Sequence, residues 1–199
     1  MNEHAQVSNA IFLRSDIAFN ALYPLNVRML SNRHWTPIHI AQLAVDFLAK
    51  DGGKILDIGS GVGKFCLAGA HFAPTAQFFG VEQRDYLIKH AESAQKTLDL
   101  SNVSFIHKNF TQLNLREFDH FYFFNSFYEN VDSLDRIDEG IDYSRALFDY
   151  YVAYLRNGLE QMPQGTKLAT FHSFHGEVPA GYEMVASHQS GDLIFWIKK

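Results

Sequence analysis

Short apolar runs and longer stretches with helical spacing take turns along the chain, and this pattern predicts an α/β fold. Apolar runs of about four to eight residues between turn residues are typical of buried strands, whereas apolar residues three or four positions apart are typical of helices. We expect strands at 54–58, 77–82, 103–107, 118–125, 166–174, 182–188 and 192–198. We expect helices at 37–50, 62–72, 84–100 and 141–162, the first of them capped by Thr36.

The order of these elements predicts a Rossmann-like sheet. Strands that alternate with helices form right-handed βαβ units, so the sheet is mostly parallel and carries helices on both faces. The stretch 118–125 (FDHFYFFN) is apolar on both sides, which is typical of a central parallel strand. The last two strands follow each other around Ser190-Gly191 and predict an antiparallel hairpin. The fold class is therefore α/β, with a seven-stranded sheet that ends in this hairpin.

Composition and charge narrow the class of protein. A chain of 199 residues is typical of one domain. The formal net charge is −5 and no run of Lys or Arg stands out, which gives no argument for non-specific nucleic-acid binding. The single cysteine, Cys66, fits a reducing compartment, and we find neither a signal peptide nor an apolar run of about 18 residues. We therefore expect a cytoplasmic protein without a membrane partner.

The stretch KILDIGSGVGKFCLAGA, residues 54–70, carries the clearest chemical signal. Gly59, Gly61 and Gly63 follow a strand and open a helix, where glycine allows positive φ and lets a ligand approach the backbone closely. Their spacing is G-x-G-x-G, which differs from the dinucleotide fingerprint G-x-G-x-x-G. Asp57 at the end of the strand would repel a pyrophosphate, and it suits a ligand with a positive group such as an ammonium.

A second acid ends the next predicted strand. Glu82 closes the run FFGVE, and an acid at this place can bind both hydroxyls of a ribose, as in dinucleotide-binding sheets. Together, Asp57 and Glu82 indicate a ligand that carries an ammonium group and a ribose.

The run ILDIGSGVGKF followed by FFGVEQRDYL resembles the first two motifs of class I S-adenosylmethionine-dependent methyltransferases. With FNSFYE after the fourth strand, it looks most like a family of small bacterial methyltransferases, and its glycine loop alone is similar to that of Dot1-like lysine methyltransferases. The resemblance implies S-adenosyl-L-methionine as the cofactor, a helical cap over it at 1–51 and a cofactor-binding methyltransferase domain at 52–199, in one globular unit. The cofactor contacts that it implies are Thr36, Asp57, Gly59, Ser60, Gly61, Gly63, Glu82, Gln83, Asn109, Phe110 and Asn125.

The resemblance gives some of these residues a specific role. Asp57 would stand near the ammonium, Glu82 would hold the ribose and Gln83 would lie beside the adenine. The superfamily usually carries an acid where this chain has Asn109, whose carbonyl oxygen can accept a hydrogen bond from the adenine amine. Thr36 could bond the methionine carboxylate, and its alternative role is that of a helix cap that needs no ligand.

Asn125-Ser126-Phe127-Tyr128 follows the fourth predicted strand, whose end faces the reactive methyl group in this superfamily. The tetrapeptide resembles the Asn-Pro-Pro-Tyr box of enzymes that methylate amide or exocyclic amino nitrogens, but it lacks both prolines. Asn125, Tyr128 and Glu129 are the candidate catalytic residues. Glu129 could take the proton of an amine acceptor, which costs about 4–5 kcal/mol to remove at pH 7, or it could be a solvated loop acid. Tyr128 could stack on a planar substrate or pack beneath the N-terminal segment.

The methyl acceptor stays open at this point. We expect a nitrogen or oxygen atom of a small molecule or a protein side chain, and less a nucleic acid, because the chain is acidic. The alternatives are an aminopropyl transferase, a nicotinamide-dependent oxidoreductase and a cofactor-binding protein without turnover, which Ser126 in place of an expected proline keeps open. We expect no metal, because His172 and His175 would face opposite sides of an extended strand and no acid or cysteine cluster joins them.

Overall fold

The fold is described by a computed structural model that covers residues 10–174 and 176–199. The first nine residues, which belong to the predicted cap, and His175 lie outside the described residues. The strands of the described chain are β1 (Lys54–Ile58), β2 (Gln77–Glu82), β3 (Val103–His107), β4 (His120–Phe124), β5 (Lys167–Phe171), β6 (Tyr182–His188) and β7 (Leu193–Lys198).

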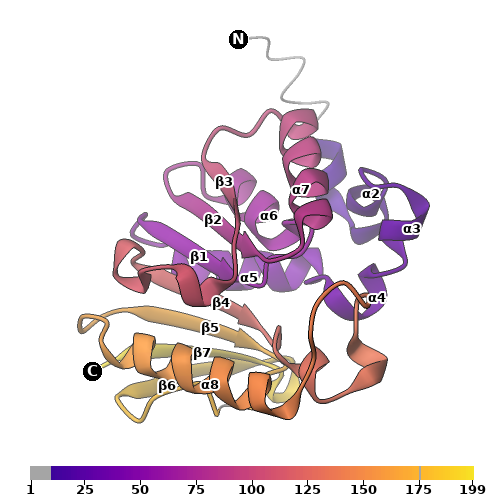
Figure 1. Cartoon of the computed structure of the whole chain (residues 1–199). Coiled ribbons are helices and arrows are strands. Elements are labelled where there is room, and N and C mark those ends of the chain that lie inside the picture. The colour runs from indigo at the N-terminus through magenta and orange to yellow at the C-terminus, as the bar shows by residue number, and fades with distance from the viewer. Residues whose placement is uncertain (1–9, 175) are drawn as a thin grey trace.

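These strands form one seven-stranded sheet in the order β3-β2-β1-β4-β5-β7-β6 (Figure 1). The first five strands pair in parallel, and β7 pairs antiparallel with both β5 and β6. The final hairpin turns at η6 (Gln189–Gly191), where Ser190 and Gly191 have φ values of 57° and 104°. The structure thus confirms the predicted mostly parallel sheet that ends in an antiparallel hairpin.

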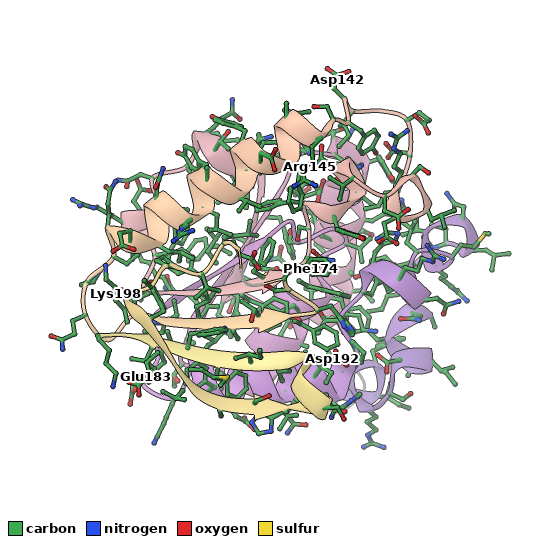
Figure 2. All side chains as sticks on the ribbon, turned by 90° about the horizontal axis from the view of Figure 1, so that it is seen from below. Asp142, Arg145, Phe174, Glu183, Asp192 and Lys198 are labelled. Carbon is green, nitrogen blue, oxygen red and sulfur yellow. The ribbon has the colours of Figure 1, made fainter. Side chains whose placement is uncertain are left out.

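Helices cover both faces of the sheet, as predicted. In Figure 1, α8 crosses in front of the sheet, whereas α5 and α6 lie behind it. Figure 2 shows the same layers from below, with side chains filling the space between the sheet and the helices. The helices are α2 (Asp16–Asn20), α3 (Leu25–Arg28), α4 (Ser31–His34), α5 (Ile38–Leu48), α6 (Lys64–Phe72), α7 (Asp85–Leu98) and α8 (Arg145–Glu160).

The observed elements are shorter than predicted where the backbone turns left-handed. Asn125 and His172 have φ values of 39° and 50°, so β4 and β5 end just before them. Gly63 has φ 81°, and α6 begins just after it. At α8 the cause is a side chain: Ser144 is extended and caps the helix by accepting a hydrogen bond from the Leu147 N–H at 3.1 Å. An apolar pattern does not show these breaks, because they depend on backbone angles.

Thr36 does not cap α5. Pro37 occupies the N-cap position and makes no side-chain capping bond. The Thr36 hydroxyl is buried and shares a hydrogen bond of 2.9 Å with the Tyr122 hydroxyl on β4. The prediction that Thr36 is the N-cap of α5 is therefore wrong. Its side chain bonds Tyr122 on the sheet and not the backbone at the start of the helix.

The N-terminal part of the chain contributes to two places. Helix α5 packs against α6 and against β4, β5 and β7, so it is a layer of the sheet. Residues 30 and 33–35, which precede α5, line the cleft described below. Among the described residues of the predicted cap at 1–51, those that line the cleft lie in the segment before α5.

The helix after the glycine loop packs unusually close to the sheet. A Cβ atom on Gly69 of α6 would come within 2.3 Å of the Phe78 ring on β2. Phe65 of the same helix stacks on the Tyr122 ring, with centroids 3.8 Å apart. This close packing holds α6, which follows the glycine loop, against β2 and β4. No helix in the described part of the chain is long and apolar enough to cross a membrane.

Candidate active site

A cleft opens at the carboxyl ends of β1, β2 and β4, where the strand order reverses between β1 and β4. Such reversal points are where open α/β sheets bind ligands. The cleft holds about 960 Å³ of space, counting the part that is open to solvent. Its wall includes Leu30, Arg33, His34, Trp35, Gly59, Gly61, Glu82, Gln83, Arg84, Asn109, Phe110, Asn125, Tyr128, Glu129, Asp135 and Tyr151.

All three glycines of the loop have positive φ, and at two of them, Gly59 and Gly63, a Cβ atom would also clash. Gly59 has φ 76°, and a Cβ atom there would lie 2.5 Å from the Ser126 side chain. Ser126 is held in place because its hydroxyl donates a hydrogen bond of 2.7 Å to the Ile58 carbonyl. Gly61 has φ 54° and open space where a Cβ atom would be. Gly63 does not line the cleft. Its side faces the Phe105 ring, which a Cβ atom on this residue would approach to 2.4 Å.

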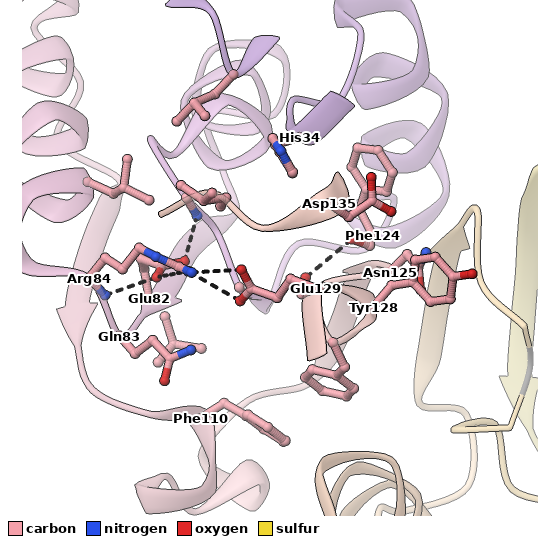
Figure 3. A pocket seen from close by; sticks show the side chains of 18 of the residues that line it. His34, Glu82, Gln83, Arg84, Phe110, Phe124, Asn125, Tyr128, Glu129 and Asp135 are labelled. Carbon is pink, nitrogen blue, oxygen red and sulfur yellow. Dashed lines mark hydrogen bonds and ion pairs between the residues drawn. The ribbon is translucent and has the colours of Figure 1, made fainter. Parts of the chain in front are cut away.

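Glu82 points its buried carboxylate into the cleft at the end of β2 (Figure 3). One oxygen accepts a hydrogen bond from the backbone N–H of Arg84 at 2.9 Å, and the other accepts one from the backbone N–H of Gly61 at 3.3 Å. A carboxylate has about four lone-pair sites, so acceptor capacity remains for a ligand's hydroxyl groups. The structure therefore joins the glycine loop and the predicted ribose acid in one wall.

Asp57 lies beneath the loop, beside a smaller cavity. This cavity is lined by Thr36, Asp57, Ser60, Lys64 and Tyr122, among others. Burial raises the pKa of Asp57 to about 8; the Cys66 thiol, which donates to its carboxyl at 3.7 Å, opposes this rise, and the negative charge of Glu82 adds to it. A positive ligand group beside such a buried acid favours its ionised, negatively charged form.

Ser60 adds a second sign of a ligand. Its hydroxyl is buried and has no hydrogen-bond partner among the described residues. Buried polar atoms are rarely left without a partner, and exceptions call for an explanation. The unpartnered hydroxyl, the two acids and the open glycine loop fit a ligand with an ammonium, a carboxylate and a ribose.

The far end of the cleft has an aromatic and amide wall. Phe110 packs edge-to-face on Tyr151 of α8, with centroids 5.6 Å apart, and Gln83 lies beside them (Figure 3). The Asn109 carbonyl oxygen already accepts two hydrogen bonds from Thr111, from its N–H at 3.1 Å and from its hydroxyl at 2.9 Å. Both lone pairs are used, so this geometry argues against the predicted acceptor role of Asn109 toward an adenine amine.

The opposite end of the cleft is built by the chain after β4. Asn125 adopts a left-handed conformation with φ 39°, which a residue other than glycine rarely does without local cause. Tyr128 lies against the Phe174 ring, with centroids 5.1 Å apart. Phe127 is buried against Phe110 and Phe123, so it packs in the core and not beneath the N-terminal segment.

Arg84 is a site residue that sequence reasoning missed, as it missed His34, Asp135 and Tyr151. Its guanidinium is buried and forms two hydrogen bonds to Glu129, at 2.6 and 3.3 Å. Burial alone would lower the pKa of Arg84, but the hydrogen bonds and charge of Glu129 raise it well above its ordinary value. Burial raises the pKa of Glu129, and Arg84 opposes this rise. Glu129 is therefore not a solvated acid, and the signal for its partner was the cation in the motif GVEQR.

The segment before α5 closes the cleft from above. His34 points into it, and burial lowers the pKa of this imidazole, while the nearby Asp135 opposes the shift (Figure 3). Arg33 forms an ion pair of 3.2 Å with Asp135, which ties this segment to the loop after β4. Among the described residues we find no group of three His, Cys, Asp or Glu side chains that could hold a metal ion.

Comparison with known proteins agrees with this geometry. The model of one protein family, described as a methyltransferase domain, matches residues 49–147. A curated relative, the release factor glutamine methyltransferase of Aliivibrio fischeri, is 33% identical over 66 residues. That stretch is 33% of this chain and 23% of that enzyme, so the chain matches less than a quarter of the relative's length.

Solved methyltransferase structures share the fold. TrmN from Thermus thermophilus matches with a TM-score of 0.61 at 20% identity, over 87% of this chain and 52% of that one. Magnesium protoporphyrin IX methyltransferase (ChlM) from Synechocystis, solved with bound S-adenosylmethionine, matches with 0.56 at 13% identity, over 100% of this chain and 99% of that one.

Residues 49–147 thus match a methyltransferase-domain family, and the chain has the fold of solved S-adenosylmethionine-dependent methyltransferases. This confirms the predicted superfamily, fold and cofactor, and it does not favour a nicotinamide-dependent oxidoreductase. The local likeness to Dot1-like enzymes stays a prediction.

Proposed function

We propose that this protein transfers a methyl group from S-adenosyl-L-methionine to a nitrogen or oxygen acceptor that lies over Asn125. One observation carries the proposal. Two buried acids, Asp57 and Glu82, lie at the carboxyl ends of neighbouring parallel strands, beside an open glycine loop, and both line cavities at the point where the strand order reverses.

The residues around the cleft divide the cofactor among them. Glu82 would hold the ribose hydroxyls with its remaining lone pairs, and Asp57 would stand beside the ammonium. The backbone at Gly59 and Gly61 lets the methionine part approach closely. Gln83 and Phe110 would flank the adenine. When bound, the cofactor supplies a methyl group on a sulfonium sulfur, so positioning of the acceptor provides much of the acceleration.

The chain's own contribution to chemistry lies after β4. The left-handed Asn125 presents its backbone and amide at the cleft wall, where it can orient an acceptor, and Tyr128 lies beside it. Both carboxylate oxygens of Glu129 bond Arg84, which argues against the predicted base role of Glu129. Asn125 and Tyr128 therefore remain the candidate catalytic residues of this proposal.

The net charge of the chain bears on the class of acceptor. We favour a small molecule or a protein side chain over a nucleic acid, because the chain carries a net charge of −5. A cytoplasmic location belongs to the same proposal and is supported by the single cysteine, Cys66, which is buried.

Calorimetric titration with S-adenosylhomocysteine tests cofactor binding. We expect the wild type to bind with micromolar affinity and NAD to bind far more weakly. Glu82→Ala removes charge-assisted hydrogen bonds of about 1.5–3 kcal/mol, so its affinity falls at least tenfold. Glu92→Ala, which removes an exposed acid of α7, is the matched control and leaves the affinity unchanged. Tighter binding of NAD than of S-adenosylhomocysteine would overturn the proposal.

Turnover needs a separate test, because binding alone also fits a protein without catalysis. Radiolabelled S-adenosylmethionine is incubated with the protein and with small-molecule and protein fractions of a lysate. We expect label in one fraction with the wild type and little with Asn125→Ala. Binding without any labelled product in every fraction would support the alternative of a cofactor-binding protein.

A further inference from the structure

A buried ion cluster connects the cofactor side of the cleft with the chain after β4. Arg84 stands at its centre with 5% of its surface exposed. Its guanidinium contacts three carboxylates from three segments: Glu82 at 3.5 Å, Glu129 at 2.6 Å and Asp138 at 3.1 Å. Figure 3 shows Arg84 between Glu82 and Glu129.

Two tyrosines extend this cluster on the side of Asp138. Tyr143 accepts a hydrogen bond of 2.9 Å from Arg84, and its hydroxyl donates one of 2.5 Å to the Asp138 carbonyl. Tyr86 of α7 donates a hydrogen bond of 2.8 Å to the Asp138 carboxylate. The Arg84 guanidinium thus attaches the segment from Glu129 to Tyr143 to the chain after β2 at three points, and the Tyr86 hydroxyl adds a fourth contact.

The geometry of the contacts suits arginine alone among the cations. Arg84 uses both terminal nitrogens on the two oxygens of Glu129, while its Nε donates to Asp138. A guanidinium offers five donors in one plane, whereas a lysine ammonium is a point charge with three. Three carboxylates face one cation here, so they repel each other if the cation is removed.

We propose that Arg84 is a positioning residue that holds the ribose acid Glu82 and the segment 129–143 in one arrangement, so that cofactor binding and closure of the acceptor side of the cleft depend on each other. This inference rests on the proposed function, because it assigns the ribose to Glu82. The coupling follows because one guanidinium, that of Arg84, contacts all three acids. A ligand that fixes Glu82 also fixes Arg84, and Arg84 is the partner of Glu129 and Asp138.

Two variants and a control test this coupling. Arg84→Met removes the cation, Arg84→Lys keeps the charge without the planar fork, and Arg145→Met removes a cation whose pair with Asp149 is exposed. Each protein is titrated with S-adenosylhomocysteine and is cut briefly with trypsin. The readout is the fragment that ends at Arg136, which lies inside the attached segment.

We expect S-adenosylhomocysteine to slow cleavage after Arg136 in the wild type and in Arg145→Met. Arg84→Met should bind S-adenosylhomocysteine at least tenfold more weakly, and the ligand at saturation should no longer slow this cleavage. Arg84→Lys should fall between the two. Circular dichroism at the assay temperature shows that each variant is folded, and a purely structural role would leave the affinity of a folded variant unchanged.

The outcomes separate the inference from the proposed function. If the wild type does not bind S-adenosylhomocysteine, the proposed function fails, and cleavage after Arg136 without ligand still reports whether Arg84 attaches the segment. If folded Arg84→Met binds like the wild type with the same protection, the inference is overturned. If Arg84→Met does not fold, Glu129→Gln decides: unchanged affinity and protection there overturn the inference, and a loss of protection supports it.

Discussion

The buried Asp57 carboxyl should make cofactor binding depend on pH. Burial raises its pKa to about 8, so at pH 7 about 90% of the free protein carries a proton on this group. An ammonium placed beside Asp57 favours the carboxylate and lowers its pKa in the complex. Binding at pH 7 should therefore release about 0.9 proton per ligand.

The magnitude follows from the fraction of ionised Asp57 in the free protein. With a pKa of about 8, this fraction is about 1% at pH 6 and about 9% at pH 7. If the complex forms with the carboxylate, the affinity for S-adenosylhomocysteine rises about ninefold between these pH values, which is about 1.3 kcal/mol. The ligand's amino group, with a pKa of about 8, stays mostly protonated over this range.

Calorimetry in two buffers of different ionisation enthalpy measures both the proton release and the affinity. Asp57→Asn removes the titrating group, so its binding should be weaker and nearly independent of pH from 6 to 7. Asp46→Asn, which changes an exposed acid of α5, is the matched control and should behave like the wild type. The reasoning is refuted if the wild type binds with equal affinity at both pH values and with a heat that does not depend on the buffer.

Three further predictions follow from individual contacts. Gly59→Ala places a methyl group 2.5 Å from a fixed serine at φ 76° and should cost about 2–4 kcal/mol in urea denaturation, whereas Gly61→Ala, with open space, should cost about 1 kcal/mol; equal costs would contradict the contact. The Cys66 thiol is fully buried, and burial raises its pKa, so a thiol reagent should modify it only at the rate of unfolding; fast modification of the native protein would contradict this. Asp16→Asn leaves the buried Lys64 ammonium, 2.5 Å from Asp16, without its charge partner and should cost about 1–3 kcal/mol in urea, less than a fully buried pair because Asp16 is 45% exposed; an unchanged midpoint would speak against it.

Local patterns in the sequence were enough to predict the sheet and to place Asp57 and Glu82 at its edge. The strands β1, β2, β3 and β6 have the predicted bounds, because their apolar runs are closed by glycine, asparagine or acidic turn residues. Asp57 and Glu82 could be placed because each lies within the last two residues of a parallel strand, and parallel strands present their carboxyl ends at one edge. Local spacing is enough for such features.

The contacts of the chain after β4 depend on the tertiary structure. Glu129 and Asp138 lie 45 and 54 residues from Arg84, and no periodic pattern in the sequence pairs groups at such separations. Thr36 likewise bonds Tyr122, which is 86 residues away, and does not cap the helix that follows it. Backbone hydrogen bonds and apolar periodicity act over a few residues, whereas a buried charge takes whichever opposite charge the folded sheet brings within reach.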